Sequence, residues 1–167
     1  MSNISSNPVA VITGGSRGVG AATAKLLASK GWNITVTCTS SLEDANSIVK
    51  ECEELGVEAM ALSADVSDDE ACRKTANETL DRWGRIDCLV NNAGTTKFVF
   101  NHGDLEGLDA DDFLHIYKVN VVGPFQMVRA CKEALNKSDN PSVINISSIA
   151  GIKGIGSSIA YASSKGA

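Results

Sequence analysis

The stretch "PVAVITGGSRGVGAATAKLLASKG", residues 8–31, guides the interpretation of the whole chain. Its apolar start predicts a short buried strand, and the residues after the glycines predict a helix that ends at Gly31. A glycine-rich turn between a strand and a helix lets backbone N–H groups approach a pyrophosphate, which then faces the positive end of the helix. The stretch therefore predicts the first unit of a nucleotide-binding α/β fold.

Strand and helix patterns alternate along the rest of the chain. Further strands are expected at 33–40, 57–66, 85–94 and 141–151, with helices at 41–56, 67–84 and 109–138 and the first turns of another at 160–167. The helix at 109–138 is expected to kink near Gly123 and Pro124. The alternation predicts a Rossmann-type doubly wound parallel sheet with helices on both faces. Because no repeat or linker interrupts it, residues 1–167 are interpreted as a single domain.

The composition argues against several classes of function. A formal charge of −5 and a pI of about 5.0 disfavour a nucleic-acid or anionic-membrane surface, which needs clustered Lys and Arg. No run approaches the ~18 apolar residues of a membrane span, and residues 1–8 show no secretory signal pattern. Five cysteines without a C-x-x-C pair predict buried thiols, and two isolated histidines predict no metal site. This cysteine usage favours a reducing compartment, so a cytoplasmic location is expected.

The glycine turn and the end of the second strand bear on the choice of cofactor. Gly14, Gly18 and Gly20 follow the spacing G-x-x-x-G-x-G, and no Gly-Lys-Ser/Thr of a Walker loop follows. NAD enzymes carry an acid about 20 residues further on for the ribose hydroxyls, but the second strand ends here in "TCTSS", residues 37–41. Small hydroxyl residues can hydrogen-bond to a 2′-phosphate, and Arg17 can supply positive charge. The pattern favours NADP(H) over NAD(H).

Two other strand ends carry polar residues. Asp65 could accept a hydrogen bond from an adenine amino group, or it could cap the next helix, a role also open to Ser67 or Asp68. "NNAG", residues 91–94, ends the fourth strand at the carboxyl edge of the sheet, where open α/β sheets bind ligands. Its Asn side chains could brace neighbouring strand ends or contact a ligand, and its Ala-Gly pair admits a flat cofactor.

A tyrosine and a lysine near the end of the sequence suggest acid/base chemistry. Tyr161 and Lys165 are four residues apart and so share one helix face. A phenol has a pKa near 10, and a neighbouring cation lowers it by stabilising the phenolate, which makes a tyrosine usable as a general acid/base. Ser148 precedes the tyrosine by thirteen residues, at the carboxyl end of the fifth predicted strand. These groups are therefore expected to converge with the glycine turn.

Taken in order, these motifs resemble those of the short-chain dehydrogenase/reductase family. The resemblance covers nearly the whole chain and rests on "TGGSRGVG" (13–20), "DV" (65–66), "NNAG" (91–94), "KVNVVG" (118–123), "ISSIAG" (146–151) and "YASSK" (161–165). The "GGSRG" turn and the hydroxyl-rich end of the second strand are similar to those of the NADP-preferring branch that includes 3-oxoacyl-[acyl-carrier-protein] reductases. The resemblance implies hydride transfer between NADP(H) and a carbonyl or secondary alcohol substrate.

The family pattern also implies roles for individual residues. Tyr161 would exchange the proton with the substrate oxygen, Lys165 would lower the phenol pKa and bind the nicotinamide ribose, and Ser148, rather than Ser147, would hydrogen-bond the substrate oxygen. Asn120 would hold a water that links the lysine to solvent. The candidate cofactor-binding residues are Gly14, Ser16, Arg17, Gly18, Val19, Gly20, Thr39, Ser40, Asp65, Val66, Asn92, Ala93, Gly94, Tyr161 and Lys165.

The sequence departs from the family pattern in length. A doubly wound sheet of order 3-2-1-4-5-6 needs a sixth strand, and only five are predicted. We therefore expect the 167 residues to be a fragment of a longer reductase, with the fifth strand as an exposed edge and activity of the chain alone in doubt. The alternatives are a naturally short, inactive cofactor-binding or partner-binding protein and an NADP-dependent epimerase or dehydratase with the same Tyr-Lys pair.

Two further segments raise expectations about partners and substrate. The helix at 109–138 is apolar on more than one face, so its outer side should be covered by a second subunit, giving a homodimer or homotetramer, or by further chain. Residues 95–107 are expected to border the substrate pocket, with Phe98 and Phe100 as an apolar wall and His102 more reasonably a solvated loop residue than a ligand.

Overall fold

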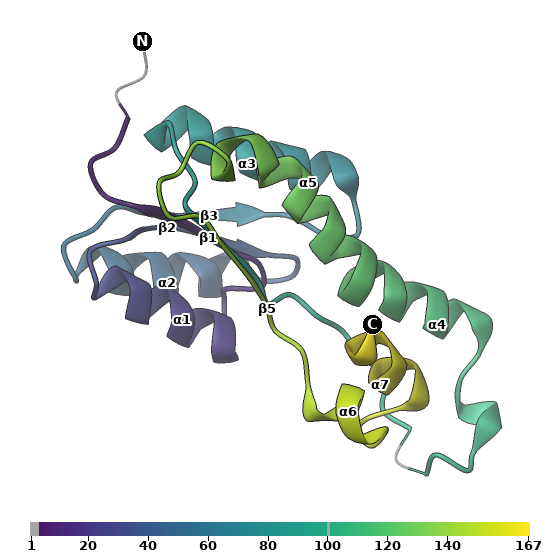
Figure 1. Cartoon of the computed structure of the whole chain (residues 1–167). Helices are drawn as coiled ribbons and strands as arrows, with labels where there is room; N and C mark the ends of the chain where they lie inside the picture. Colours follow the sequence, from purple (N-terminus) through teal and green to yellow (C-terminus); the bar gives the residue numbers. More distant parts are fainter. Residues whose placement is uncertain (1–3, 100) are drawn as a thin grey trace.

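The computed structural model of the protein describes residues 4–99 and 101–167. In this part of the chain, five parallel strands form one sheet with the order β3-β2-β1-β4-β5 (Figure 1). The strands are β1 (Val9–Ile12), β2 (Asn33–Cys38), β3 (Ala59–Ser63), β4 (Cys88–Asn91) and β5 (Ser142–Asn145). This order corresponds to the first five strands of the predicted doubly wound fold, so the α/β Rossmann-type prediction is confirmed.

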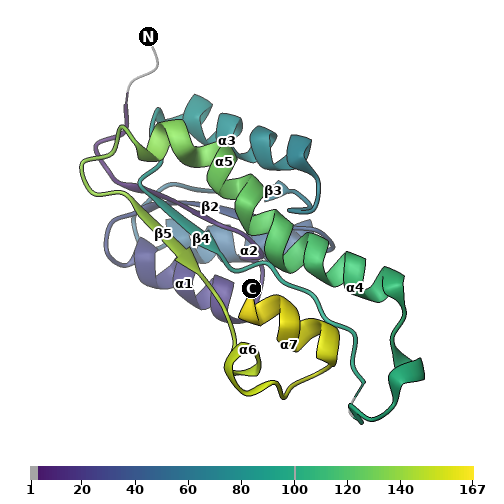
Figure 2. The same ribbon diagram turned by 45° about the vertical axis from the view of Figure 1, so that its right-hand side comes forward.

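Helices cover both faces of the sheet. The helices are α1 (Gly18–Ala28), α2 (Leu42–Glu53), α3 (Asp69–Trp83), η1 (Leu105–Gly107), α4 (Ala110–Tyr117), η2 (Lys118–Val122), α5 (Gly123–Leu135), α6 (Ile149–Lys153) and α7 (Ile159–Gly166). Figures 1 and 2 show α1 and α2 on one face and α3 and α5 on the other, while α4, α6 and α7 lie beyond the end of the sheet. None of the helices in the described part is long and apolar enough to cross a membrane.

The core lies on both faces of the middle of the sheet, and burial decreases toward β5. All four residues of β1 are buried, and apolar clusters pack on each side of it, one beneath α1 and α2 and the other beneath α3 and α5. By contrast, all four residues of β5 are exposed, with Val143 at 43% and Ile144 at 46%. The expectation that the fifth strand is an exposed edge is therefore confirmed.

The segment predicted as one kinked helix consists of two α-helices joined by a π-helical turn. The turn, η2, begins at Lys118, before the expected kink at Gly123 and Pro124. The cause is the proline: Pro124 has no N–H to donate to the carbonyl four residues earlier, on Asn120, so the regular helical pattern is interrupted there. The location of Asn120 at this interruption matters for the site.

Two details of the C-terminal third differ from the prediction. The strand expected at 141–151 ends at Asn145, and residues 149–153 instead form α6. The reason is local, because the Ser148 hydroxyl caps the helix by accepting the Ala150 N–H, and Gly154 ends it with φ +66°. The helix α7 was predicted correctly as a helix starting near residue 160.

The five cysteines are all free and buried, as the sequence indicated. Burial raises the pKa of the Cys52 thiol to about 11 and that of Cys131 to about 12. These side chains are therefore neutral thiols in the core near pH 7.

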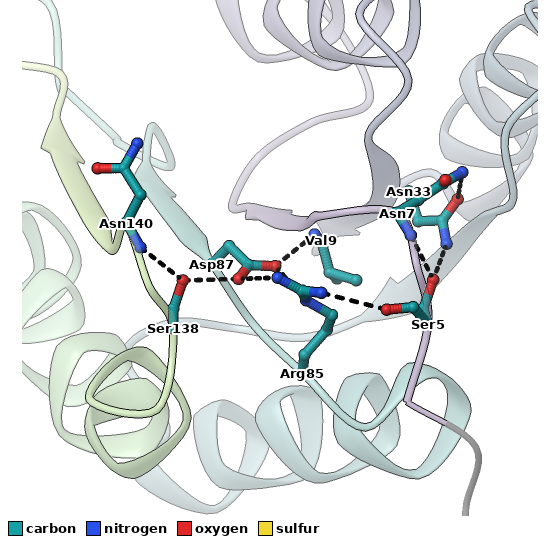
Figure 3. Close-up of polar contacts among 8 residues, drawn as sticks. All are labelled: Ser5, Asn7, Val9, Asn33, Arg85, Asp87, Ser138 and Asn140. Carbon is teal, nitrogen blue, oxygen red and sulfur yellow. Dashed lines mark hydrogen bonds and ion pairs between the residues drawn. The ribbon is translucent and has the colours of Figure 1, made fainter.

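A buried carboxylate lies at the amino ends of the strands, opposite the predicted site, and links the segments that lead into β1, β4 and β5 (Figure 3). Asp87, 3% exposed, accepts hydrogen bonds from the Val9 N–H, the Arg85 guanidinium and the Ser138 hydroxyl. Burial alone would raise the pKa of Asp87, but the hydrogen bonds from Arg85, Ser138 and Val9 outweigh it and hold that pKa below its usual value. Arg85 also donates to the Ser5 carbonyl, so the network fixes the entry into β1.

Candidate functional site

The glycine turn after β1 is held by close backbone packing. Gly14 has φ +63°, and a Cβ placed on it would lie 2.9 Å from the Cα of Ala93. A Cβ on Gly20 would lie 2.5 Å from both the Asn92 Nδ2 and the Gly14 carbonyl oxygen. Asn92 donates through Nδ2 to the carbonyls of Thr13 and Gly14, at 3.0 and 2.9 Å. Two of the predicted glycines are thus required by space, and Asn92 braces the turn.

Thr13 is a part of this brace that sequence reasoning missed. Its side chain is buried, and its hydroxyl oxygen accepts the N–H groups of Asn92 and Ala93 at 3.1 and 3.0 Å. The hydroxyl links the end of β1 to the segment that follows β4. Its position directly before the glycines was the one indication in the sequence, but a threonine there is equally typical of the last residue of a strand.

A cavity of about 420 Å³ extends from the glycine turn along the ends of β2 and β3 to α4 and η2. It is lined by Gly14, Ser16, Arg17, Cys38, Thr39, Ser40, Ala64, Asp65, Val66, Asn92, Ala93, Gly94, Thr95, His115 and Val119. Most of the candidate cofactor-binding residues are therefore brought together in one cavity. Gly18, Val19 and Gly20 are not among those lining it and form the first turn of α1 instead. His115 and Val119 were not predicted, because nothing in the sequence shows that α4 closes this side.

Two charged residues of the cavity differ in their surroundings. Arg17 is exposed and stands immediately before the first residue of α1. Asp65 accepts the Ser67 N–H at 2.8 Å, and Asp68, not Asp65, caps α3 by accepting the Glu70 N–H. Asp68 therefore caps α3 in place of Asp65. The contact of Asp65 with adenine stays a prediction.

Tyr161 and Lys165 lie on α7, whose start is fixed by a buried serine. Ser158 is fully buried, and its hydroxyl accepts the Tyr161 N–H at 3.2 Å. The Lys165 Nζ lies 6.0 Å from the centroid of the tyrosine ring and donates to the Ile146 carbonyl at 2.8 Å. Burial lowers the pKa of Lys165 from its ordinary value. The helix therefore presents the phenol and the amine side by side, as predicted from their spacing.

Asn120 ties α7 to the segment after β4. Its side chain is buried, its Oδ1 accepts the Thr95 N–H, and its Nδ2 donates to the Thr95 carbonyl and the Ser164 hydroxyl. A Cβ on Gly94 would lie 3.3 Å from the Asn120 Oδ1 and 3.5 Å from the Lys165 Nζ. Asn120 is thus close to Lys165 and acts as a connector in the structure. Ser164, a second connector, was missed because a serine on a helix carries no signal of its own.

A second cavity, of about 590 Å³, adjoins Tyr161. It is lined by Arg17, Asn92, Gly94, Thr95, Thr96, Phe98, Ile146, Ser147, Ser157, Tyr161 and Lys165. Ser147, rather than Ser148, is among these residues, and the Ser147 hydroxyl donates to the Lys165 carbonyl. The Ser148 hydroxyl caps α6 as an acceptor and so keeps its proton for donation. Its contact with substrate stays a prediction, while Phe98 lines the cavity as expected and Phe100 lies outside the described residues.

Asn91 has a bracing role. Its Nδ2 donates to the Oδ1 of Asn145, its neighbour across β4 and β5, at 2.9 Å. Its own Oδ1 is buried and has no hydrogen-bond partner among the residues that the structure describes. Asn91 lines a third cavity, of about 450 Å³, together with Asn120, Asn145, Ser164 and Lys165 among others. In residues 4–99 and 101–167, no cluster of three or more His, Cys, Asp or Glu side chains could hold a metal ion.

Comparison with known families identifies the chain as a member of a large group. The family model described as short chain dehydrogenase matches residues 8–167, so the chain belongs to the short-chain dehydrogenase family. It is 38% identical over 159 residues to a protein of Streptomyces violaceoruber named as ketoacyl reductase 2 of the granaticin polyketide synthase. It is 34% identical over 157 residues to a 3-oxoacyl-[acyl-carrier-protein] reductase of Synechocystis. These alignments cover 95% and 94% of this chain and 62% of each relative, so the chain spans about three fifths of their length.

Solved structures have the same fold. A protein of Burkholderia xenovorans described as a short-chain dehydrogenase/reductase is 40% identical, with a TM-score of 0.94 over 97% of this chain and 68% of that one. A metagenomic short-chain oxidoreductase in complex with NADP is 34% identical, with a TM-score of 0.85 over 95% of this chain and 70% of that one. A xylitol dehydrogenase with bound NAD⁺ is 31% identical, with a TM-score of 0.86 over 95% and 60%.

Proposed function

We propose that the protein is an NADP(H)-dependent oxidoreductase that interconverts a carbonyl compound and a secondary alcohol. One observation carries the proposal: the cavity at the glycine turn and the cavity beside Tyr161 share Arg17, Asn92, Gly94 and Thr95. A dinucleotide with its phosphates at the glycine turn could therefore extend directly to the tyrosine. The relatives named as ketoacyl and 3-oxoacyl reductases support this class of reaction.

The chain's own residues would perform the proton chemistry. NADP(H), when bound, supplies the hydride through its nicotinamide ring. Tyr161 would give its phenolic proton to the carbonyl oxygen in reduction and take it back in oxidation. The Lys165 amine, close to the phenol, would stabilise the phenolate charge when protonated, and Ser148 would donate a hydrogen bond to the substrate oxygen. Asn120, which lies near the Lys165 Nζ, would hold the water that returns the proton from solvent.

The choice of NADP(H) rests on charge at the end of β2. The cavity is lined by Thr39 and Ser40, which follow β2, and by Arg17, which precedes α1, and β2 contributes no carboxylate. A guanidinium and hydroxyls favour a 2′-phosphate, which a carboxylate would repel. Similar structures contain NADP in one case and NAD⁺ in another, so the fold alone does not decide the cofactor, and the proposal assigns the choice to these residues. Arg17→Gln should weaken NADPH binding by about tenfold or more and leave NADH binding within about twofold.

The substrate is proposed to be a ketone, with 3-oxoacyl thioesters among the first to test because of the two relatives' names. The test is the loss of reduced-nicotinamide absorbance when the full-length protein and NADPH are mixed with ketones and β-ketoacyl thioesters. Turnover is expected of the full-length protein, and Tyr161→Phe should lower it by at least about 10³-fold without weakening NADPH binding, because only the acid/base group is removed. Equal activity of wild type and Tyr161→Phe would contradict the assigned role.

Assembly and location are expectations of the same proposal. The outer face of α4 and α5 exposes Leu114 at 68% and Phe125 at 62%, and a homodimer or homotetramer would cover them. Light scattering of the purified chain would test this, with a monomer counting against it. The five buried free thiols favour the reducing environment of the cytoplasm, which fractionation of cells would test.

A further inference from the structure

Two hydroxyl groups meet at the wall of the cavity beside Tyr161. Thr96, in the segment after β4, and Ser157, in the loop between α6 and α7, share a short hydrogen bond between their side-chain oxygens. Both residues are half-buried, and both line the cavity that contains Tyr161 and Lys165. We call these two side chains the hydroxyl pair.

The hydroxyl pair is not the sole contact between the two segments. The Val99 N–H donates to the Ser157 carbonyl at 2.7 Å, and the His102 Nε2 lies 3.0 Å from the Gly156 carbonyl oxygen. These two contacts also join the segment after β4 to the loop before α7. The two hydroxyls at the cavity wall can therefore have a role in addition to loop attachment.

The hydroxyl pair has one proton left with which it can donate a hydrogen bond to a further oxygen. Two hydroxyls carry two protons, and their mutual hydrogen bond uses one of them. The other recorded contact is from the Thr96 hydroxyl to the Lys97 carbonyl, at a long 3.4 Å. The hydroxyl pair thus retains one proton that an incoming oxygen can accept at little cost, and it retains lone pairs for an incoming donor.

The same cavity offers an apolar surface as well. Phe98, 65% exposed, lines it within two residues of Thr96, and Ile146 lines it from the end of β5. A molecule with an apolar part and two oxygens could contact all of these surfaces at once. One oxygen would meet Tyr161 and the other the hydroxyl pair.

We propose that the hydroxyl pair is a specificity determinant that recognises a second oxygen of the substrate. The substrate class is a ketone whose chain carries another carbonyl or hydroxyl a few bonds from the reacting carbon. This inference rests on the proposed oxidoreductase function and adds to it which ketones are preferred. A site with polar groups built for a substrate oxygen discriminates strongly against an analogue that lacks it, because those groups then stay unpaired.

The test compares two substrates of equal chain length with four proteins. Methyl 3-oxobutanoate carries the second carbonyl, and 2-hexanone replaces the ester oxygens by hydrocarbon. kcat/KM is measured with NADPH for wild type, Thr96→Val, Ser157→Ala and a control, Thr23→Val. Thr23 lies on α1, where its hydroxyl contacts only the Val19 carbonyl among the described residues. Comparing ratios between proteins cancels the different intrinsic reactivities of the two ketones.

We expect each cavity variant to lower kcat/KM for methyl 3-oxobutanoate about tenfold and for 2-hexanone less than about twofold. Thr96→Ser should restore most of the difference, and Thr23→Val should change neither. Equal losses on both substrates would mean that the hydroxyl pair only supports the loops, which overturns the inference and leaves the oxidoreductase function intact. Turnover of neither ketone by wild type would count against the proposed function itself.

A binding measurement gives the same comparison without turnover. Ligand-observed NMR with NADP⁺ present can compare methyl 3-hydroxybutanoate with 2-hexanol on each variant. The hydroxy ester should bind more tightly to wild type, and Thr96→Val should remove about tenfold of that advantage. An unchanged preference in Thr96→Val would overturn the inference even if no ketone is reduced.

Discussion

The two halves of the site share one edge of the sheet but are supported in different ways. The glycine turn stands on β1, whose side chains are fully buried, and the hydroxyl of Thr13 and the amide of Asn92 brace it. The other half, which contains Tyr161 and Lys165 and which we call the chemical half, follows β5 in the chain. All residues of β5 are exposed. In the chemical half, helix α7 packs against α4 and α6 with Ala160 and Ala162 buried. Hydrogen bonds made by Asn120, Ser147 and Lys165 attach it further.

This difference indicates that cofactor binding and catalysis can fail separately. Core burial contributes roughly 25 cal/mol for each Å² of apolar surface, whereas a hydrogen bond contributes only about 0.5–1.5 kcal/mol net. The cofactor half should therefore form whenever the sheet forms. The chemical half should open locally at lower free energy, since the strand that precedes it, β5, is exposed and α7 buries only small apolar side chains.

The largest loss of stability is expected when the Asp87 network, which links the segments leading into β1, β4 and β5, is broken. Asp87→Asn removes the charge that pairs with Arg85, and breaking a buried ion pair costs about 3–5 kcal/mol of unfolding free energy. Urea denaturation measures this, with the exposed Asp81→Asn as a matched control of less than about 0.5 kcal/mol. A loss below about 1 kcal/mol would show that β1, β4 and β5 do not depend on this carboxylate.

The difference in stability between wild type and Asp87→Asn should depend on pH. The pKa of Asp87 is held below its usual value in the folded chain, so its ionised form stabilises the fold above the ordinary carboxyl pKa of about 4. That contribution is lost as the pH falls through the folded-state pKa. The stability difference between wild type and Asp87→Asn should therefore narrow between pH 4 and pH 2, as followed by denaturation midpoints. A difference that stays constant or widens would exclude this carboxylate as the cause.

A clash in the glycine turn should disable the cofactor half alone. Gly20→Ala places a methyl 2.5 Å from the Asn92 Nδ2, so the brace must shift. We expect NADPH affinity to fall at least about 100-fold, equivalent to about 2.7 kcal/mol, in a fluorescence titration. Ala22→Ser is the control, because this exposed residue of α1 lies outside the cavity. Equal affinity of Gly20→Ala and wild type would place the phosphates elsewhere.

Matched valines compare the support of the two halves directly. Val11→Ala in β1 should cost about 2–3 kcal/mol because the side chain is fully buried, and Val143→Ala in β5 less than about 1 kcal/mol because it is 43% exposed. Urea denaturation of both variants measures the difference. Equal costs would mean that β5 is covered in solution, for example by a second copy of the chain.

The smallest effect concerns the attachment of α7. Asn120→Ala removes the hydrogen bonds to Thr95 and Ser164, so amide exchange at 161–165 should quicken about tenfold, while exchange in β1 stays the same. Hydrogen–deuterium exchange followed by mass spectrometry resolves both segments. Asn136→Ala, an exposed position at the end of α5, should change neither. Unchanged exchange at 161–165 would show that Asn120 is not what holds the helix.

Much of this arrangement could be predicted from the sequence because it follows from local patterns. The positions of the strands and helices, the glycine turn and the shared face of Tyr161 and Lys165 depend on periodicity and spacing over short distances. The strand order follows from the doubly wound fold class that this alternation indicates. The parts that were missed depend on contacts between distant segments. Thr13 and Asn92 are 79 residues apart, and the cavity wall formed by His115 requires knowing how α4 lies against the sheet.

Serines were the hardest residues to assign. Ser147 and Ser148 are adjacent at the end of β5, and their hydroxyls have different tasks, one bonding the Lys165 carbonyl and the other capping α6. Spacing to Tyr161 chose Ser148, but it gave no sign of the helix that this residue caps. A small hydroxyl residue can cap, connect or bind substrate, and only its neighbours in space distinguish these roles.

The proposed function depends most directly on cofactor binding by the chain itself. The first cavity is lined by residues from Gly14 to Val119, and the second, where the nicotinamide would lie, adds residues up to Lys165. Both are formed within the 167 residues, so this chain should bind the cofactor by itself. Titration of the purified chain with NADPH, followed by nicotinamide fluorescence, should give saturable binding with a Kd of about 1–100 μM, and NADH should bind at least about tenfold more weakly. No saturable binding of NADPH at about 1 mM, or tighter binding of NADH, would contradict the account.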